Sequence, residues 1–378
     1  MLLVGAGLLL RSFLHVLEVD LGFQPERAAA IKVEYNDSAA TPTARVQKRT
    51  AIFQQILARV GAIPGVEAAG ISDFLPLGQN RAWGMPWPKN LRRPDRLPAG
   101  PLVYVVTPGY MRAMGIRVRG RDFTWDDGPT SQNVVMVNQA LGHFLATSAH
   151  WPNGDATAQV LSDGNQDMLI VGVTDDVHAA NVEGDAGWQI YYPVTQKTPT
   201  GAQLVIRTML PPATLAGSVL LTLRDLNPSQ PAAEFRPIRM LVDHAVSPRR
   251  FFMILVVAFA TLGLLLAALG IYGVISYSVT RQTQEIGIRM ALGASMGQVQ
   301  RHVLAGTLRL TLAGIVVGAA TSLAVAKLIS SLLFDTSPWD VGTYIGMALA
   351  LLLVALISGY IPARRASRID PLVALRGN

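Results

Sequence analysis

The side chains that could perform chemistry form no recognisable catalytic set. The chain of 378 residues has no cysteine, which excludes disulfides, thiolate nucleophiles and cysteine-based metal sites. It contains no phosphate-binding loop of the GxxxxGK[ST] type, no HExxH zinc motif and no GxSxG nucleophile elbow. The one acidic cluster with a histidine, DDVH at 175–178, follows an apolar stretch and favours a solvated turn over a metal site. We therefore expect no enzyme activity, no metal site and no cofactor.

A short polar stretch at 281–295, RQTQEIGIRMALGAS, is the most informative part of the sequence. Its apolar residues are Ile286, Ile288, Met290 and Leu292. Between them lie the charged residues Glu285 and Arg289 and the glycines Gly287 and Gly293. Such a segment between two membrane helices could be a helix parallel to the membrane that receives a push from a partner. It could equally be an amphipathic loop at the interface without a partner. The residues alone leave both interpretations open.

Three apolar runs follow residue 250. The chain has 15% charged residues, against about 25% in ordinary soluble domains. Residues 251–280 carry no charge, and neither do residues 341–363. Because a spanning helix needs about 20 mostly apolar residues, we expect three full transmembrane helices, at about 251–279, 304–333 and 341–362. In the middle one, Arg309 and Lys327 would reach toward opposite interfaces.

The loops predict the orientation. Arginines lie in 281–301 and in the C-terminal tail, whereas the loop 334–340 has two aspartates and no basic residue. Short basic loops stay in the cytoplasm, so we expect 281–301 and the C-terminus inside and residues 11–250 outside. The net charge of +7 is therefore explained by membrane orientation, and nucleic-acid binding is not expected.

The N-terminus predicts part of a further helix. Residues 1–10 are apolar but too few to span, and Arg11 follows them. The basic start and small-residue cleavage site of a signal peptide are not evident. Residues 1–12 are interpreted as the outer part of a truncated transmembrane helix that ends at about Arg11, and the chain as the C-terminal part of a longer protein.

Small residues recur every four positions in the second apolar run. They are Gly314, Gly318, Ser322 and Ala326, and the preceding run repeats the spacing with Gly263 and Ala267. This spacing allows close approach of helix backbones in lipid. A helix-packing face is favoured over the alternative that glycine and alanine are simply common in membrane helices.

The long segment 23–247 predicts an α+β domain outside the membrane. Short apolar runs predict strands at 30–35, 66–71, 102–106, 134–137, 168–173, 190–192, 204–206 and 235–240. Helical patterns lie at about 43–61, 137–147 and 212–226, and loops are expected at 77–100 and 148–166. Helices follow only some strands, which favours α+β over a doubly wound sheet.

Several motifs together resemble FtsX/MacB-type ABC transporter permeases. SYSVTRQTQEIGIRMALGAS (276–295) resembles the cytoplasmic loop of that family, and the likeness continues through GIYGVISY (270–277), LLFDTSPWD (332–340) and YIPARRASRIDPLVALR (360–376). VTPGYMRAMGIRVRGRDFT (106–124), VVMVNQAL (134–141), IVGVTDDVH (170–178) and YYPVTQ (191–196) resemble a MacB-like periplasmic core domain. LLVGAGLLLRSF (2–13) and LPLG (75–78) resemble double-length acidobacterial-type permeases, of which this chain would be the C-terminal half. The family's usual W-P…G segment is irregular at 150–165.

The resemblance implies a MacB-like periplasmic core domain at 23–247 and an FtsX-like permease domain at 251–378, in a bacterial inner membrane. A separate ABC-type ATPase would bind the ATP and would contact Glu285, Ile286, Gly287, Arg289, Leu292 and Gly293. Its motion would be transmitted to the outer domain to export drug, peptide or lipid-like substrates, with a second permease half or a homodimer partner alongside. The alternatives are a signalling protein that controls an outer hydrolase or sensor, and an inactive fragment of a longer permease.

Overall fold

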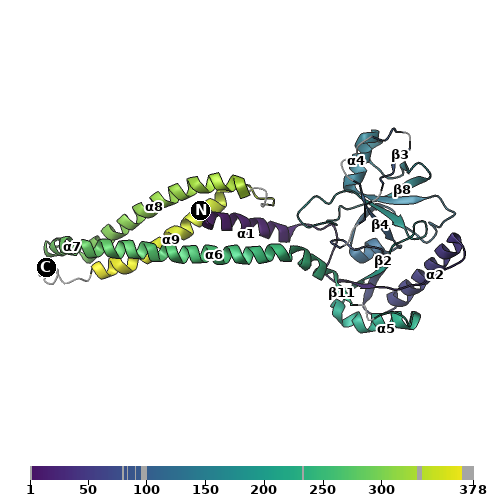
Figure 1. Cartoon of the computed structure of the whole chain (residues 1–378), viewed down its shortest axis with the longest axis horizontal. Helices are drawn as coiled ribbons and strands as arrows, with labels where there is room; N and C mark the ends of the chain where they lie inside the picture. The colour runs from purple at the N-terminus through teal and green to yellow at the C-terminus, as the bar shows by residue number, and fades with distance from the viewer. Residues whose placement is uncertain are drawn as a thin grey trace. The chain divides into compact units, whose positions relative to one another are not determined.

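The computed structural model describes residues 2–78, 81–82, 84–89, 91–94, 100–231, 234–329 and 334–367 (Figure 1). The chain divides into two compact units. The helical unit comprises Met1–Glu18 and Pro248–Asn378, and the α/β unit comprises Val19–Ser247.

The α/β unit is built on one mixed sheet, which has eleven strands among the described residues. Its order is β11-β1-β10-β2-β4-β9-β6-β8-β7-β3, and β5 pairs with β8. The strands are β1 (Ala28–Lys32), β2 (Val66–Ser72), β3 (Trp87–Pro88), β4 (Leu102–Val106), β5 (Val118–Gly120), β6 (Val134–Asn138), β7 (Val160–Ser162), β8 (Asp167–Thr174), β9 (Gln189–Pro193), β10 (Gln203–Thr208) and β11 (Arg236–Pro237). β4 runs parallel to β9 and β6 runs parallel to β8, whereas the other pairs are antiparallel. A mixed sheet with helices placed after only some strands is α+β, so the predicted fold class is confirmed.

Helices cover both faces of this sheet. They are α2 (Pro42–Gly61), α3 (Tyr110–Met114), α4 (Gln139–Ala149) and α5 (Ala216–Leu226), with the short 3₁₀ turns η1 (Pro152–Gly154) and η2 (Pro212–Leu215). α2 begins where the Thr41 hydroxyl accepts a hydrogen bond from the amide of Ala44, with Pro42 in the first turn. Its buried Phe53 shares one core cluster with Ile71 of β2, and α5 lies beside α2 (Figure 1). α3 packs on the opposite face of β2, at Gly70, because neighbouring strand residues point to opposite sides.

Two predictions about this unit are wrong in detail. Residues 235–240 were expected to form a strand, but only Arg236–Pro237 pair with β1, and the helix α6 (Ile238–Arg281) begins at the next residue. Ile238, Val242 and Val246 are all buried, and their spacing of four residues is helical. The expected loops 77–100 and 148–166 contain β3 and β7, which are too short to show an alternating pattern.

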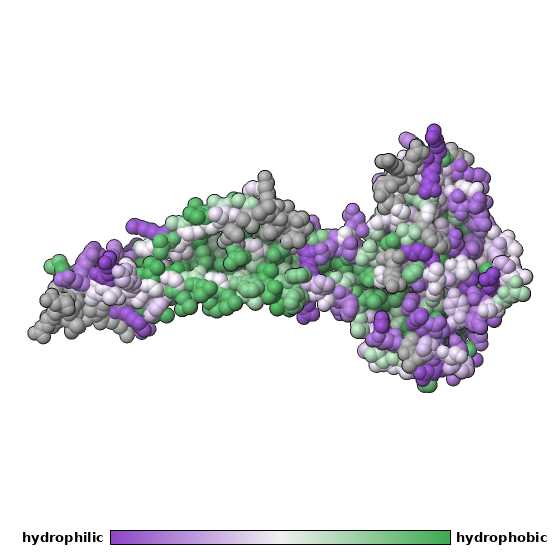
Figure 2. Space-filling model, viewed as in Figure 1, coloured by the Kyte–Doolittle hydropathy of each residue, from purple (hydrophilic) through white to green (hydrophobic). Residues whose placement is uncertain are grey.

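The helical unit contains α1 (Leu2–Glu18), the membrane part of α6, α7 (Thr283–Ala291), α8 (Met296–Ile329) and α9 (Val341–Ala366). Among the described residues, three helical segments are long and apolar enough to cross a membrane: Ile238–Arg281, Met296–Ala324 and Val341–Ala366. Only 11% of each apolar window is buried inside the protein, which suits contact with lipid. Figure 2 shows apolar side chains over the middle of this unit and polar ones at the end that carries α7. α8 begins at Met296, eight residues before the membrane span expected from 304, and this first part of the helix mixes polar and apolar residues.

α1 does not end near Arg11 as expected but continues to Glu18. Polar side chains on its last turns have partners in the same unit. Arg11 pairs with Asp340 at 2.5 Å, and the Ser12 hydroxyl accepts hydrogen bonds from the Arg249 guanidinium (2.8 Å) and the amide of Phe334 (2.7 Å). These contacts hold the middle of α1, and the apolar residues Phe13, Leu14, Val16 and Leu17 continue the helix toward Glu18.

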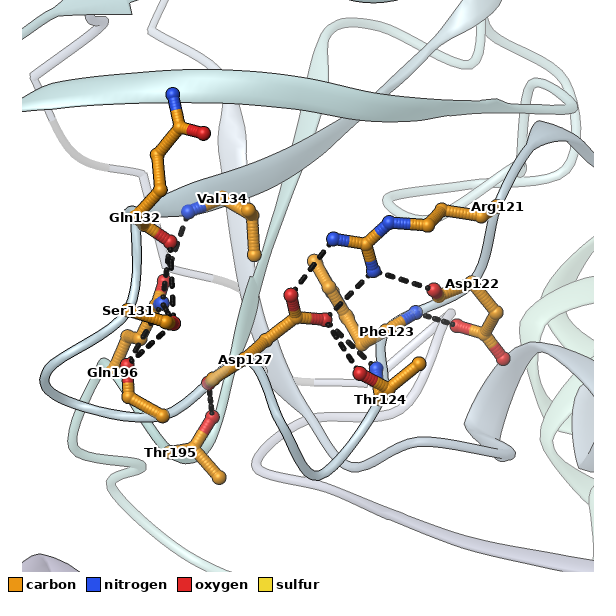
Figure 3. A network of polar contacts seen from close by, with 11 residues as sticks. Arg121, Asp122, Phe123, Thr124, Asp127, Ser131, Gln132, Val134, Thr195 and Gln196 are labelled. Carbon is orange, nitrogen blue, oxygen red and sulfur yellow. Dashed lines mark hydrogen bonds and ion pairs between the residues drawn. The ribbon is translucent and has the colours of Figure 1, made fainter.

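A polar network connects the loop at 121–134, between β5 and β6, to Thr195 and Gln196 at the start of the β9–β10 connection (Figure 3). The Arg121 guanidinium donates to both carboxylate oxygens of Asp127, at 2.7 and 2.8 Å, and the amide of Thr124 donates to the same carboxylate at 2.8 Å. Gln196 accepts from the amide of Val134 at 2.9 Å and donates to the Gly128 and Gln132 carbonyls. Burial alone would raise the pKa of Asp127. The hydrogen bonds from Arg121 and Thr124 outweigh burial and hold this pKa below its usual value.

Gly70 offers a test of the packing between β2 and α3. A Cβ at this position would lie 2.4 Å from Cα and 2.5 Å from N of Tyr110, and this backbone cannot give way cheaply. Gly70→Ala is expected to destabilise the protein by about 1–3 kcal/mol, measured by thermal unfolding of the purified chain. Gly61→Ala is the matched control, since its Cβ would meet nothing within 4 Å. Equal stability of the two variants would contradict the packing described here.

The lowered pKa of Asp127 predicts a pH dependence. A carboxylate whose pKa is lower in the folded than in the unfolded chain stabilises the fold above its unfolded pKa, and that stabilisation disappears as the pH falls through the folded value. We expect Asp127→Asn to be less stable than the unmodified chain at pH 6 and to lose less stability between pH 5 and pH 3, measured by denaturant unfolding at each pH. Asp126→Asn, which changes the adjacent carboxylate outside this ion pair, should keep the original slope.

Candidate functional site

The predicted coupling residues lie on α7 and the turn that follows it. α6 ends at Arg281, and the Thr283 hydroxyl donates to the carbonyl of Thr280 at 2.8 Å, which closes the junction between the two helices. α7 then runs for nine residues and contains Glu285, Ile286, Gly287 and Arg289. The 281–295 segment is therefore a short helix, in agreement with its amphipathic sequence.

One face of α7 is buried between the three long helices. Ile286 is 6% exposed and belongs to a cluster that we call the α7 cluster. The cluster consists of Ile275 and Val279 from α6, Ile286 from α7, Val299 from α8 and Ala366 from α9, with Ile271, Met290 and Val303 packed against it. α7 is thus packed in one cluster with residues of all three candidate spans.

The opposite face of α7 is open. Leu292 is 83% exposed and Ile288 is 44% exposed. Glu285 and Arg289, one helical turn apart, form an ion pair on the surface. The exposed face thus combines apolar side chains with a charged pair, a composition that suits contact with another protein.

Both ends of the turn after α7 are closed by capping hydrogen bonds. The amide of Gly293 donates to the carbonyl of Met290 and the amide of Ala294 donates to the carbonyl of Arg289, both at 3.0 Å. This is a Schellman motif, and Gly293 has the positive φ of +99° that the motif requires. Ser295 then caps α8: its hydroxyl accepts from the amide of Gln298, whose side chain accepts from the amide of Ser295.

Two further hydrogen bonds connect the helices near α7. Gln300 of α8 donates to the Ser367 hydroxyl after α9 at 2.9 Å, and Arg365 of α9 donates to the Tyr272 hydroxyl of α6 at 3.3 Å. The helices are therefore joined by polar contacts as well as by the α7 cluster at this end.

The predicted ladder of small residues has a mixed environment. Ser322 is 3% exposed and donates to the Gly318 carbonyl of its own helix at 2.7 Å. A Cβ on Gly314 would meet nothing within 4 Å, whereas one on Gly263 would lie 3.8 Å from Leu2. Ala267 is half-buried, and the side chain of Ala326 lies outside the described residues. Helix packing through the ladder stays a prediction.

Two glycines that the sequence patterns do not mark lie at close contacts between helices. A Cβ on Gly7 of α1 would lie 2.8 Å from Thr343 and from Met347 of α9. A Cβ on Gly359 of α9 would lie 2.9 Å from Thr307 of α8. Each is a single close approach to a side chain of another helix, so no periodic spacing reveals it.

The carboxylates of the 175–178 cluster are occupied by structural contacts. Asp175 accepts hydrogen bonds from Arg117 (2.6 Å) and Gln139 (2.9 Å), and Asp176 accepts from Asn138 (2.6 Å) and from the amide of Ala140 (2.8 Å). Within the described ranges, no group of three or more His, Cys, Asp or Glu side chains could hold a metal ion. A cleft of about 690 Å³ beside this cluster is lined by side chains of both charge signs, including Arg119, Asp155 and Asp176.

Comparison with known proteins places the membrane part in a family. Residues 257–371 match the FtsX-like permease C-terminal family. A "Macrolide export ATP-binding/permease protein MacB" of Azoarcus sp. is 36% identical over 146 residues, which cover 38% of this chain and 22% of that protein. A "Probable export ATP-binding/permease protein" of Pseudomonas fluorescens is 24% identical over 284 residues, 68% of this chain and 40% of that protein.

An "Uncharacterized ABC transporter permease YvrN" of Bacillus subtilis is 25% identical over 291 residues, which cover 73% of this chain and 70% of that protein. This chain spans about two-fifths of the Pseudomonas relative, which is described as an ATP-binding/permease protein. The match over 257–371 includes the last 25 residues of α6 and all of α7, α8 and α9, which are the elements of the α7 cluster. Residues 257–371 thus form an FtsX-like permease domain, and the chain as a whole is similar to ABC export permeases of the MacB type.

Proposed function

We propose that this permease transmits the ATP-driven motion of a separate ABC-type ATPase to its α/β unit, and that α7 is the docking element. The chain itself would bind no ATP and no other cofactor. The burial of Ile286 in one cluster with residues of α6, α8 and α9 carries the proposal, because it connects α7 to all three candidate spans.

The exposed face of α7 would be the contact surface for the ATPase. Leu292 is the most exposed large apolar side chain of the described residues and stands beside the Glu285–Arg289 ion pair. Gly293 would keep Leu292 in place, since the Schellman turn fixes the backbone there. Ile286 would face away from the ATPase and pass its movement to the cluster.

The orientation follows from the charges. Segment 281–301 and the C-terminus would be cytoplasmic, and residues 11–250, including the α/β unit, would lie outside the inner membrane. A cytoplasmic α7 is where an ATPase would find it. The full assembly would include the bilayer and a second permease half or a second copy of this chain.

We propose export of drug, peptide or lipid-like substrates as the transported class, in keeping with the export proteins among the relatives. A mechanotransmitting role in signalling to an outer hydrolase or sensor uses the same coupling through α7. Transport predicts that an added substrate stimulates ATP hydrolysis, whereas signalling predicts a specific outer protein partner and no such stimulation.

Reversal of one charge on α7 tests the docking surface. Glu285→Lys removes the ion pair with Arg289 and places two cations on the exposed face. We expect the ATPase that copurifies with the unmodified chain, measured by affinity purification and ATP hydrolysis, to be lost or reduced at least about tenfold, which corresponds to about 1.4 kcal/mol. Glu234→Lys is the matched control, since Glu234 also forms an exposed ion pair, with Arg236 at 2.7 Å in the α/β unit. Absence of any ATPase from the unmodified preparation would refute the coupling proposal.

Two substitutions on opposite faces of α7 separate docking from transmission. Leu292→Ala removes an exposed side chain and should weaken ATPase copurification. Ile286→Ala removes a buried one and should leave copurification intact. It should, however, abolish the ATP-dependent change in hydrogen exchange of α6 and α8, because the cavity would uncouple α7 from the cluster. The same effect from both substitutions would show that α7 has no such division of faces.

A further inference from the structure

A surface groove of about 410 Å³ lies along the first turns of α8 and reaches Leu356 of α9. It is separate from the α7 cluster, although both use the same end of α8. Arg301, Leu304 and Leu308 form its wall on α8. At 1.5 Å per residue, Arg301 and Leu308 are about 10 Å apart along the helix.

The groove changes from polar to apolar along its length. Gln300 and Arg301 lie near the start of α8, and Leu304 and Leu308 follow one and two turns later. α9 supplies Leu356, which lies one turn before Gly359, the residue in contact with Thr307. Leu308 and Leu356 therefore sit at a similar depth in the helical unit, and both are 36% exposed.

Small residues keep the polar end of the groove accessible. Gly297 and Ala305 lie four residues before and after Arg301, hence on the same side of α8. A Cβ on Gly297 would meet nothing within 4 Å. Short side chains on both sides leave the guanidinium open to a ligand as large as a phosphate.

Arg301 has a free positive charge. Within the part of the chain that the structure describes, Arg301 forms no ion pair and its side chain makes no hydrogen bond. The acidic residue nearest to it in the sequence, Glu285, is paired with Arg289. An unpaired arginine at the end of a membrane helix attracts an anion of the interface, and a guanidinium binds phosphate through two parallel hydrogen bonds.

We propose that this groove binds one anionic phospholipid, with its phosphate on Arg301 and an acyl chain along Leu304, Leu308 and Leu356. The order of polar and apolar groups along the groove matches the order from headgroup to chain in a phospholipid. The positive charge favours a lipid with a net negative charge over a zwitterionic one, whose ammonium group would offset the attraction. Val299 and Val303, from the same turns of α8, pack in the α7 cluster, so a bound lipid would brace the helix that carries them.

The proposal does not depend on ATPase docking, and its test does not use an ATPase. Leu356→Trp places a fluorescent reporter in the groove of the full-length chain reconstituted in vesicles. Quenching by brominated phosphatidylglycerol is compared with quenching by brominated phosphatidylcholine, with the chain lacking the substitution as the baseline. We expect phosphatidylglycerol to bind about fivefold more tightly, the effect of one interfacial arginine.

Adding Arg301→Gln to Leu356→Trp should remove this preference. Adding Arg281→Gln instead should keep it, because Arg281 lies over the ring of Tyr277 at the end of α6 and is not part of the groove. Native mass spectrometry of the chain without the tryptophan reporter gives a second measurement, in which one phosphatidylglycerol should remain bound and be lost with Arg301→Gln. Equal quenching by both lipids would overturn the proposal, as would a preference that arises only after residues 368–378 are removed.

Discussion

The burial of Ile286 is the constraint that positions α7 within the helical unit. A helix of nine residues is too short to be stable in water by itself, so α7 must be held by packing and by its caps. Burying an isoleucine contributes about 1.5–3 kcal/mol, and the Schellman turn and the Ser295 capping box fix the chain after α7. The position of α7 is thus determined by its packing against residues of the three long helices.

The sequence predicted the existence of this segment but not its buried face. Alternating apolar and charged residues indicated an amphipathic helix at 281–295. Ile286 and Met290 turn toward the cluster, whereas Ile288 and Leu292 are exposed. All four are apolar, and only the arrangement of α6, α8 and α9 decides which pair is covered. The periodicity of so short a helix does not predict which of its apolar residues other helices will bury.

The α/β unit shows the same division between local and tertiary information. The strand Leu102–Val106 was predicted with its observed bounds, because five apolar residues between Pro101 and Thr107 form a buried central strand. The strand expected at 235–240 was wrong because a helix with buried residues at a spacing of four competes for the same apolar residues. β3 and β7, of two and three residues, exist only through their pairing with each other and with β8.

α1 is held in the helical unit by close packing at a glycine and by polar contacts. A ladder of small residues indicates that close approach is possible, but Gly7 shows where it occurs, since its missing side chain admits Thr343 and Met347. The other end of α1 is held by Arg11 and Ser12, whose partners come from residues more than 230 positions away in the sequence. Close packing at Gly7 therefore holds one part of α1, and the hydrogen bonds of Arg11 and Ser12 hold its middle. The apolar residues Phe13, Leu14, Val16 and Leu17 follow Arg11, so the hydrophobic pattern continues past this single charged residue and the helix reaches Glu18.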